Sequence, residues 1–237
     1  SDELVAAIDG ELESIDEEAY WRQVFERVRS SAAPLFPGTL HTGVSEVVTI
    51  LCLEFADFES FCRGQEPEAV LRTMNQLLAE FEEVFHWRGG HVTGYLGSGL
   101  LALVREAGHA ERAVHTALDL RAVVAEFNRP RGLLGLPRLP ARIGVATGPV
   151  FLGNLGTYQY LCFTPVGPVV NLARHLAHQA VPESPCISQE TQEQVRDHFI
   201  YRPDSPRQVE ITAVGASRVW DVADRGRPSS KPSGRQS

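Results

Sequence analysis

The side chains that most often carry catalysis are unevenly represented in this sequence of 237 residues. Its 22 basic residues are nearly all arginine, and the only lysine, Lys231, lies in a polar tail rich in Ser, Pro and Arg. A Walker phosphate-binding loop, a Schiff base and pyridoxal phosphate chemistry all need a lysine inside the fold, so these mechanisms are excluded. Five histidines are scattered without a pair at metal-binding spacing, and we interpret them as packing or solvated residues. They are His91, His109, His115, His178 and His198.

The four cysteines follow neither a C-x-x-C pattern nor any other zinc-ligand spacing. They are Cys52, Cys62, Cys162 and Cys186, and two of them lie in apolar, strand-like runs. This pattern indicates buried free thiols in a reducing compartment. Because the sequence also shows no signal peptide and no apolar stretch of membrane-spanning length, we predict a cytoplasmic location.

The net charge of −8 is concentrated at the N-terminus, where residues 1–20 carry eight acids and no base. Beyond Tyr20 acidic and basic residues balance, so no basic field of the kind that collects nucleic acid is expected. Residues 225–237 form a short basic tail that could contact an acidic partner.

Hydrophobic periodicity predicts the elements that must position any site. The run 47–55 is typical of a strand buried on both faces, and 68–87 and 109–127 have the spacing of amphipathic helices. Two short strands, 91–96 and 100–104, flank the turn Gly97-Ser98-Gly99, and 141–147 is a further strand. The order strand, helix, hairpin, helix, strand is the split β-α-β of a ferredoxin-like α+β sheet.

Further elements are expected on both sides of this core. The segment 14–31 has a capping box and an apolar stripe, which predicts a helix that packs on the domain or on a partner helix. Beyond the core we expect a strand near 160–166, helices over 169–178 and 189–198, and strands near 208–213 and 217–222. We divide the chain into an acidic lead-in (1–13), an N-terminal helix with linker (14–40), a folded domain (41–224) and a flexible basic tail (225–237).

Several short motifs resemble one known family, the class III adenylate/guanylate cyclase catalytic domain. They occur in family order over roughly 46–222, and the stretch from Val48 to Val104 fits without a gap. The motifs are Val48-Thr49-Ile50-Leu51, Pro67-Glu68 with Asn75, Gly89-Gly90 followed by Gly97, His109-Ala110-Glu111-Arg112, Arg142-Ile143-Gly144-Val145 with Gly153-Asn154, and Thr164-x-x-Gly167-x-x-Val170-Asn171.

The resemblance implies a two-metal mechanism in a site formed between two domains. Two aspartates hold metal ions that activate the ribose 3′-hydroxyl and clamp the triphosphate. An asparagine and an arginine from the dimer partner stabilise the transition state, and a further pair of positions reads the purine.

The family's metal positions fall on Glu54 and Ser98 in the ungapped alignment. A glutamate could still coordinate magnesium with a shifted ion, whereas a neutral serine removes one formal negative charge from the site. An alternative alignment places the first metal position at Asp57, within Phe55-Ala56-Asp57, and needs an insertion in the strand. We expect no resident cofactor, with Mg²⁺ or Mn²⁺ relevant only if cyclase activity persists.

The remaining family positions are also largely changed. The purine-reading positions fall on Gly94, which offers no donor, and Thr164, which resembles bacterial members with threonine there. The transition-state positions fall on Asn171, which is retained, and His175, which cannot offer the fixed fork of an arginine. The phosphate-binding turn carries Asp57 and Glu59 in place of a glycine and a small hydroxyl residue, and these two acids would repel a triphosphate.

These losses lead us to expect a degenerate cyclase homology domain that makes no cyclic nucleotide. Such a pseudoenzyme would act in signal transduction as a homodimer or as a heterodimer with another cyclase-like domain or signalling protein. Three alternatives stay open: a divergent active cyclase that recruits Glu54, Asp57 or Glu59 as ligands, a half-site partner lending Thr164 and Asn171 to an active chain, and a nucleotide sensor without chemistry.

Overall fold

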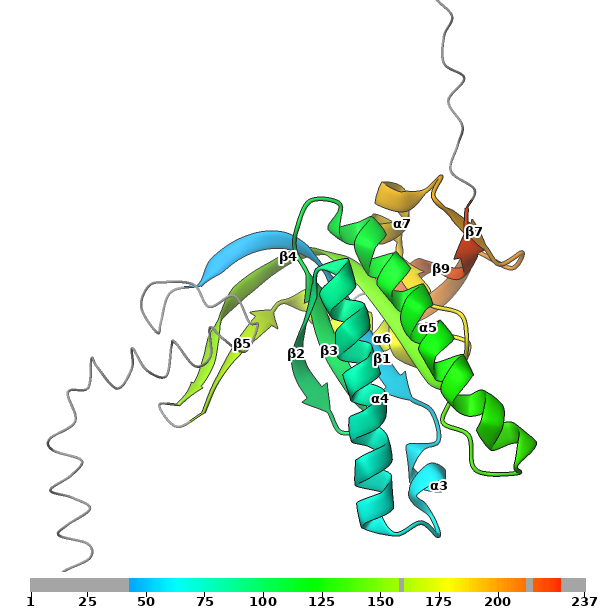
Figure 1. Ribbon diagram of the computed structural model, residues 1–237. Coiled ribbons are helices and arrows are strands. Elements are labelled where there is room, and N and C mark those ends of the chain that lie inside the picture. The colour runs from blue at the N-terminus through cyan, green and yellow to red at the C-terminus, as the bar shows by residue number, and fades with distance from the viewer. Residues whose placement is uncertain (1–42, 158–159, 212–214, 227–237) are drawn as a thin grey trace, which may run out of the picture. The chain divides into compact units, whose positions relative to one another are not determined.

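The computed structural model describes residues 43–157, 160–211 and 215–226 (Figure 1). The helix predicted over 14–31, the acidic lead-in and most of the basic tail lie outside these ranges. The described elements are, in chain order, β1 (Val44–Phe55), α3 (Phe58–Cys62), α4 (Pro67–Arg88), β2 (Gly90–Leu96), β3 (Gly99–Val104), α5 (His109–Leu133), β4 (Ala141–Thr157), β5 (Tyr160–Val166), α6 (Pro168–Gln179), β6 (Cys186–Ser188), α7 (Gln189–Val195), β7 (Phe199–Tyr201), β8 (Arg207–Ile211) and β9 (Gly215–Arg225).

One mixed sheet organises the described part of the chain. Its strand order is β2-β3-β1-β4-β6-β9-β7, with β5 paired to β4 and β8 paired to β9. The first four strands have the order and the helical connections of a ferredoxin-like unit, as the sequence predicted. All pairs within this unit are antiparallel, and β1 pairs with β4 over its whole length and with β3 over Thr49–Glu54. The predicted α+β class is therefore confirmed.

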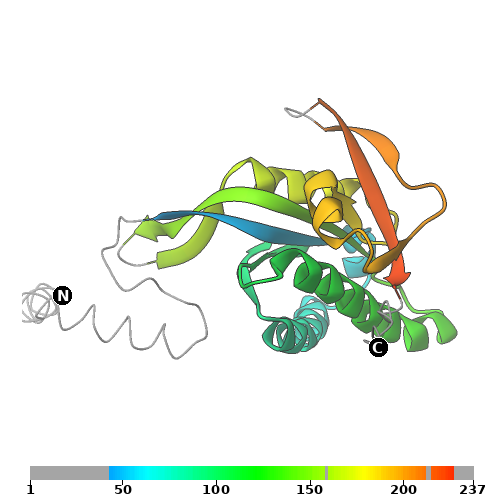
Figure 2. The same ribbon diagram turned by 90° about the horizontal axis from the view of Figure 1, so that it is seen from above.

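Helices cover both faces of the sheet (Figure 2). The long helices α4 and α5 lie on one face, and α6 lies on the other. Residues of β1 divide accordingly, because successive side chains of a strand point to opposite faces. Leu51, Leu53 and Phe55 join the core under α4 and α5, whereas Glu54 points toward α6.

The close approach of α6 to the sheet depends on Gly144 of β4. A Cβ atom at this position would collide with the carbonyl oxygen of Ala173 and the backbone nitrogen of Ala177, both on α6. Only glycine lets the helix lie this near to the strand. The sequence motif around Gly144 therefore sets where the polar side of α6 lies relative to β1.

Buried hydroxyl groups link the sheet to the helices around it. The Thr49 hydroxyl lies 2.8 Å from that of Thr147, which in turn lies 2.9 Å from that of Thr191 on α7. Thr49 also lies 2.8 Å from Nδ1 of His109, at the start of α5. These contacts satisfy polar groups that would otherwise be costly to bury, and they agree with the interpretation of His109 as a packing residue.

Two elements are longer than the sequence suggested. Strand β4 continues ten residues beyond the expected end at Thr147, through Pro149 and three glycines, because β1 and then β5 pair with it. Helix α5 continues past Pro130 to Leu133, where the Arg131 guanidinium lies over the rings of Phe61 and Phe127. In both cases, strand pairing or side-chain packing outweighs the tendency of proline and glycine to end a strand or helix. The sequence alone does not reveal these contacts.

Three short elements were not predicted, namely α3, β6 and β7. The C-terminal strands otherwise lie where expected, and the partly exposed Arg207 on β8 forms an ion pair with the buried Asp221 on β9. All four cysteines are free, with Cys52 and Cys186 buried.

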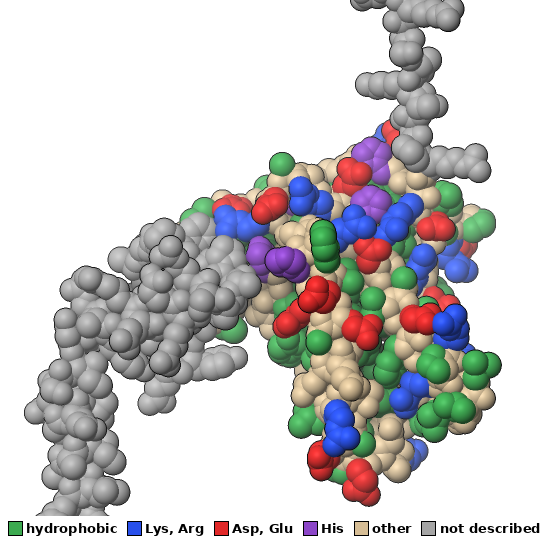
Figure 3. All heavy atoms as spheres, viewed as in Figure 1, with side chains coloured by type: hydrophobic (Ala, Val, Ile, Leu, Met, Phe, Trp, Pro, Cys, Tyr) green, Lys and Arg blue, Asp and Glu red, His purple; other side chains and the backbone are tan. Residues whose placement is uncertain are grey.

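No helix within the described residues is long and apolar enough to cross a bilayer. Acidic and basic side chains intermingle on the face seen in Figure 3.

Candidate functional site

The carboxylate of Glu54 lies near the C-terminal end of β1, where β1 is paired with β3 on one side and β4 on the other. We call this end of the three strands the sheet edge. The cross-strand partners of Glu54 are Gly99 on β3 and Arg142 on β4. The Glu54 side chain is 17% exposed, so it is partly shielded from water. This is the first metal position that the resemblance predicts.

Ser98 is brought beside this carboxylate by the β2–β3 hairpin. The backbone N–H of Phe55 donates to the carbonyl oxygen of Ser98 at 2.8 Å. Gly99 makes the close approach possible, because a Cβ there would collide with the carbonyl oxygen of Leu53. The structure thus places the two predicted metal positions next to each other, one carrying a carboxylate and the other a hydroxyl.

His178 of α6 contacts the Glu54 carboxylate, a relationship that sequence reasoning missed. Its Nδ1 lies 3.1 Å from Oε2 of Glu54. The guanidinium of Arg142 donates to the backbone carbonyl of His178 at 3.4 Å, which ties the end of α6 to the same edge. The sequence signal was available as helical spacing, since His178 follows Asn171 by seven residues and His175 by three and so lies on the same side of the helix.

The polar side of α6 carries the predicted transition-state positions. Asn171 and Arg174 are exposed and His175 is half-buried, while Ala173 and Leu176 on the opposite side pack into the core. Because Asn171 and His175 are four residues apart, their side chains leave the helix on neighbouring turns of one face. This face runs from Asn171 to His178, toward the end of β1.

Burial, and to a smaller extent the nearby Glu54 carboxylate, raise the pKa of the Cys52 thiol from 9.0 to about 12, against a lowering by Arg174. Cys52 and Glu54 point to the same face of β1 because they are two residues apart.

The turn after β1 holds Asp57 in the left-handed region, with φ of 56°. The backbone N–H of Phe61 donates to the carbonyl oxygen of Asp57 at 3.0 Å, which starts α3. A non-glycine residue seldom takes this conformation, and glycine takes it freely. The exposed Glu59 carboxylate lies 4.0 Å from the guanidinium of Arg63. Asp57 and Glu59 occupy the positions of the family's phosphate-binding turn. Both lie at the start of α3, Asp57 as its N-cap and Glu59 in its first turn.

The predicted purine-reading positions lie on adjoining segments of the sheet. Gly94 is on β2 and Thr164 on β5, and these strands come together where the Cys162 thiol lies 3.9 Å from the carbonyl oxygen of Thr93. The Thr164 hydroxyl donates to the carbonyl oxygen of Cys162 at 3.3 Å. A Cβ at Gly94 would meet no atom within 4 Å, so the space for a side chain is open.

Other clusters of titratable groups do not add a metal site. His198 and His115 lie 3.1 and 3.7 Å from the two carboxylate oxygens of Glu111 on α5, and the His115 ring lies 4.8 Å from that of Phe199. Burial lowers the pKa of His115. Over the described ranges, no three His, Cys, Asp or Glu side chains are grouped so as to hold a metal ion.

The chain matches the adenylate and guanylate cyclase catalytic domain over residues 41–221. It therefore belongs to this family, as the motifs predicted. It is 29% identical to adenylate cyclase 1 of Rhizobium meliloti over 133 residues, which are 54% of this chain and 20% of that protein. It is 28% identical to guanylate cyclase 2G of Mus musculus over 179 residues, 70% of this chain and 16% of that protein. The chain thus spans a fifth or less of the length of these two relatives.

Solved cyclase domains share the fold. The guanylyl cyclase Cya2 superposes with a TM-score of 0.72 at 28% identity, covering 79% of this chain and 97% of that structure. The adenylyl cyclase CyaB from P. aeruginosa superposes with a TM-score of 0.71 at 21% identity, covering 77% and 96%. Nearly complete coverage of both structures indicates that the described residues contain the whole cyclase fold.

Proposed function

We propose that this domain does not convert ATP or GTP to a cyclic nucleotide by itself and acts as a dimerising regulatory module. The observation that carries the proposal is the contact between Glu54 and His178. It engages the carboxylate of the first metal position, while the second metal position, Ser98, has no carboxylate, and the family's mechanism requires two carboxylates open to metal ions.

The charge at the two metal positions disfavours cation binding. Divalent magnesium prefers anionic oxygen ligands and gives up its water reluctantly. Here Ser98 supplies no charge, and the imidazole of His178 occupies space beside Oε2 of Glu54. Binding two cations at these two positions would require displacing His178, and Glu54 would be the single anionic ligand that the two positions supply.

The donor geometry at His175 disfavours stabilisation of the transition state. A guanidinium presents several N–H groups in a rigid plane, and an imidazole presents at most two in diverging directions. His175 therefore cannot clamp a phosphoryl group as the family's arginine does. Loss of one preorganised donor typically costs about 10²–10³ in rate, and loss of metal support adds to that.

The left-handed backbone at Asp57 supports the ungapped alignment on which these assignments rest. Its φ of 56° suits the glycine that the family places in the phosphate-binding turn. In that alignment Glu54, and not Asp57, is the first metal position.

An apolar face on the β4–β5 hairpin supports the dimerising role. We call it the arm face and define it by four exposed residues: Phe151 and Leu155 on β4, Val166 on β5, and Val47 on the adjoining β1. Val47 is paired with Pro149, and Phe151 with Val166, and directly paired residues point to the same side of a sheet. Thr147 of β4 faces the core, and Phe151 and Leu155 of the same strand point to the same side. The arm face therefore lies on the core side of the sheet, beyond the part that the helices cover. Several exposed apolar side chains on one side of a strand pair are typical of an interaction site.

The test of inactivity is product formation by the purified full chain with ATP or GTP in Mg²⁺ and in Mn²⁺, detected as cyclic nucleotide by mass spectrometry. We expect no product from the wild type. A restored variant carrying Glu54→Asp, Ser98→Asp, His175→Arg and His178→Ala should form product, with Gly94→Lys added for purine binding. Wild-type product that disappears in Glu54→Ala would refute the proposal and favour a divergent active cyclase.

The dimerising role is tested separately by sedimentation velocity. Leu155 is 61% exposed on the arm face, so Leu155→Arg should turn a wild-type dimer into a monomer without unfolding it. Leu133→Arg is the matched control, because Leu133 is 85% exposed at the end of α5, away from the arm face. A monomeric wild type at every concentration tested would exclude the homodimer.

A second candidate function is that of a half-site partner for an active cyclase chain. The observation that favours it is that Asn171 is retained and exposed on α6, while Thr164 is retained on β5. Mixing this chain with a metal-competent relative whose own asparagine position is mutated should then produce activity. Loss of that activity with Asn171→Ala in this chain would establish the role, and no activity on mixing would exclude it.

A further inference from the structure

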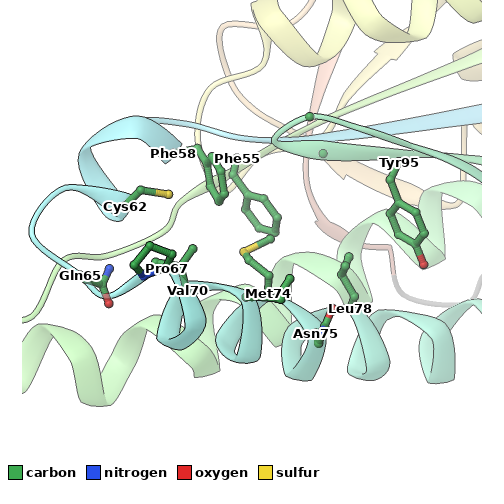
Figure 4. A pocket seen from close by; sticks show the side chains of 13 residues that line it. Phe55, Phe58, Cys62, Gln65, Pro67, Val70, Met74, Asn75, Leu78 and Tyr95 are labelled. Carbon is green, nitrogen blue, oxygen red and sulfur yellow. The ribbon is translucent and has the colours of Figure 1, made fainter.

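A cavity lies between α3, α4 and the β2–β3 hairpin, on the opposite face of the sheet from Glu54 and His178 (Figure 4). Its volume is about 460 Å³. Phe55 lines it, and because Phe55 directly follows Glu54 in β1, the two side chains point to opposite faces. The cavity is therefore separate from the candidate site.

The lining of this cavity is apolar and aromatic. Phe58 comes from α3, Val70, Met74 and Leu78 come from α4, and the Tyr95 ring comes from β2 (Figure 4). The Met74 thioether lies beside the Phe55 ring in this view. Aromatic rings and thioether sulfur both pack favourably on a further aromatic ring.

The polar side chains at the cavity are few and partly engaged elsewhere. The Gln65 amide donates to the carbonyl oxygen of Phe61, and the Tyr95 hydroxyl donates to Glu82 at 3.4 Å. None of the residues that line the cavity carries a charge. An ionised ligand would lose its hydration here without gaining a partner of opposite charge.

The size of the cavity also limits its occupant. Small-molecule sites typically have volumes of about 300–1,000 Å³, and this cavity lies in that range. A molecule of two or three rings fits a cavity of this size.

We infer that this cavity is a binding site for an uncharged aromatic small molecule. Its occupant contacts both segments that carry the predicted metal positions, because Phe55 adjoins Glu54, and Gly97 and Gly99 flank Ser98. The cavity thus lies where β1 pairs with the β2–β3 hairpin, on the opposite face of the sheet from Glu54. This inference does not depend on whether the domain is catalytically active.

Met74 provides a specific reporter, because it is the single methionine of the sequence and lines the cavity. We would label the full chain with ¹³C-methyl methionine and titrate it with N-phenyl-1-naphthylamine, an uncharged aromatic probe. The Met74 resonance, assigned by its loss in Met74→Leu, should shift saturably. A resonance that stays unmoved through the titration would overturn the inference.

Leu71→Trp tests the location, since Leu71 lines the cavity yet is 62% exposed, so a larger ring there can narrow the entrance without disturbing the core. It should weaken probe binding by about ten-fold or more, which corresponds to about 1.4 kcal/mol. Leu133→Trp, the same change at an exposed leucine that does not line the cavity, should bind as the wild type does. Equal binding by the two variants would contradict the assignment.

The charge requirement is tested with 8-anilinonaphthalene-1-sulfonate, which has the same ring system and a sulfonate. We expect its affinity at Met74 to be lower than that of the uncharged probe by about ten-fold or more. Equal affinity would show that the cavity does not select against charge and would refute that part of the inference.

Discussion

Nδ1 of His178 on α6 lies 3.1 Å from Oε2 of Glu54 at the end of β1. The two residues are far apart in sequence and meet because α6 lies against β4 at Gly144. A side chain of the domain itself therefore contacts the carboxylate that the family mechanism would assign to a metal ion. The same contact links the sheet edge to the helix face that carries Asn171 and His175.

Metal affinity should rise when this contact is removed and a second carboxylate is added. We expect Ser98→Asp with His178→Ala to bind Mn²⁺ about ten-fold more tightly than Ser98→Asp alone, because His178 no longer competes for Glu54. Isothermal titration calorimetry with Mn²⁺ measures the difference.

The control for this prediction is His178→Ala in the wild-type background. His178 is mostly exposed, so its loss should change the free energy of unfolding by about 0.5 kcal/mol or less. Wild-type protein that binds Mn²⁺ as tightly as the double variant would contradict the prediction.

Much of the fold followed from local patterns. The β-branched run of β1, the spacing of apolar residues in α4 and the glycines of the hairpin each indicate one element, and their order indicates the ferredoxin-like sheet. The extension of β4 beyond Thr147 could not be foreseen, because its pairing with β5 outweighs the local preference of Pro149 and the glycines to end a strand.

The candidate site was only partly predictable for a similar reason. Glu54 and Ser98 follow from ungapped alignment to family motifs, and the hairpin brings them together. Helical spacing places His178 on the same side of α6 as Asn171 and His175. Its contact with Glu54 depends in addition on the tertiary packing of α6 on the sheet, which that spacing does not show. The apolar cavity likewise arises from the separation of α3, α4 and the hairpin, although each lining residue alone looks like an ordinary core position.

The two glycines of the hairpin region should differ sharply in tolerance to substitution. Gly99→Ala forces a methyl group against the carbonyl oxygen of Leu53, and we expect a loss of about 1–3 kcal/mol in the free energy of unfolding. Gly94→Ala places its methyl group in open space and should change stability by about 0.5 kcal/mol or less. Urea denaturation of both variants measures the contrast, and similar losses would be inconsistent with the hairpin geometry.

The strained turn after β1 predicts an order of stability among variants of Asp57. Asp57→Gly should be more stable than Asp57→Ala by about 1 kcal/mol, because alanine pays the steric cost of the left-handed region and glycine does not. Chemical denaturation provides the comparison, and Glu59→Ala serves as an exposed control on the same turn with an expected change of about 0.5 kcal/mol or less. Equal stability of the glycine and alanine variants would argue against a positive φ at this residue.

The Cys52 thiol should make stability fall at alkaline pH. Burial raises its pKa from 9.0 to about 12 in the folded state. Between these values the unfolded chain releases the thiol proton and the folded chain keeps it, so the unfolded state binds fewer protons and the free energy of unfolding decreases as pH rises. The decrease approaches about 1.4 kcal/mol per pH unit for one thiol.

Tyr95 and Tyr201 also have raised pKa values, so the wild type must be compared with Cys52→Ala, whose slope should be smaller by about that amount. Parallel pH profiles for the two proteins above pH 9.0 would mean that the thiol is accessible to water and ionises alike in both states.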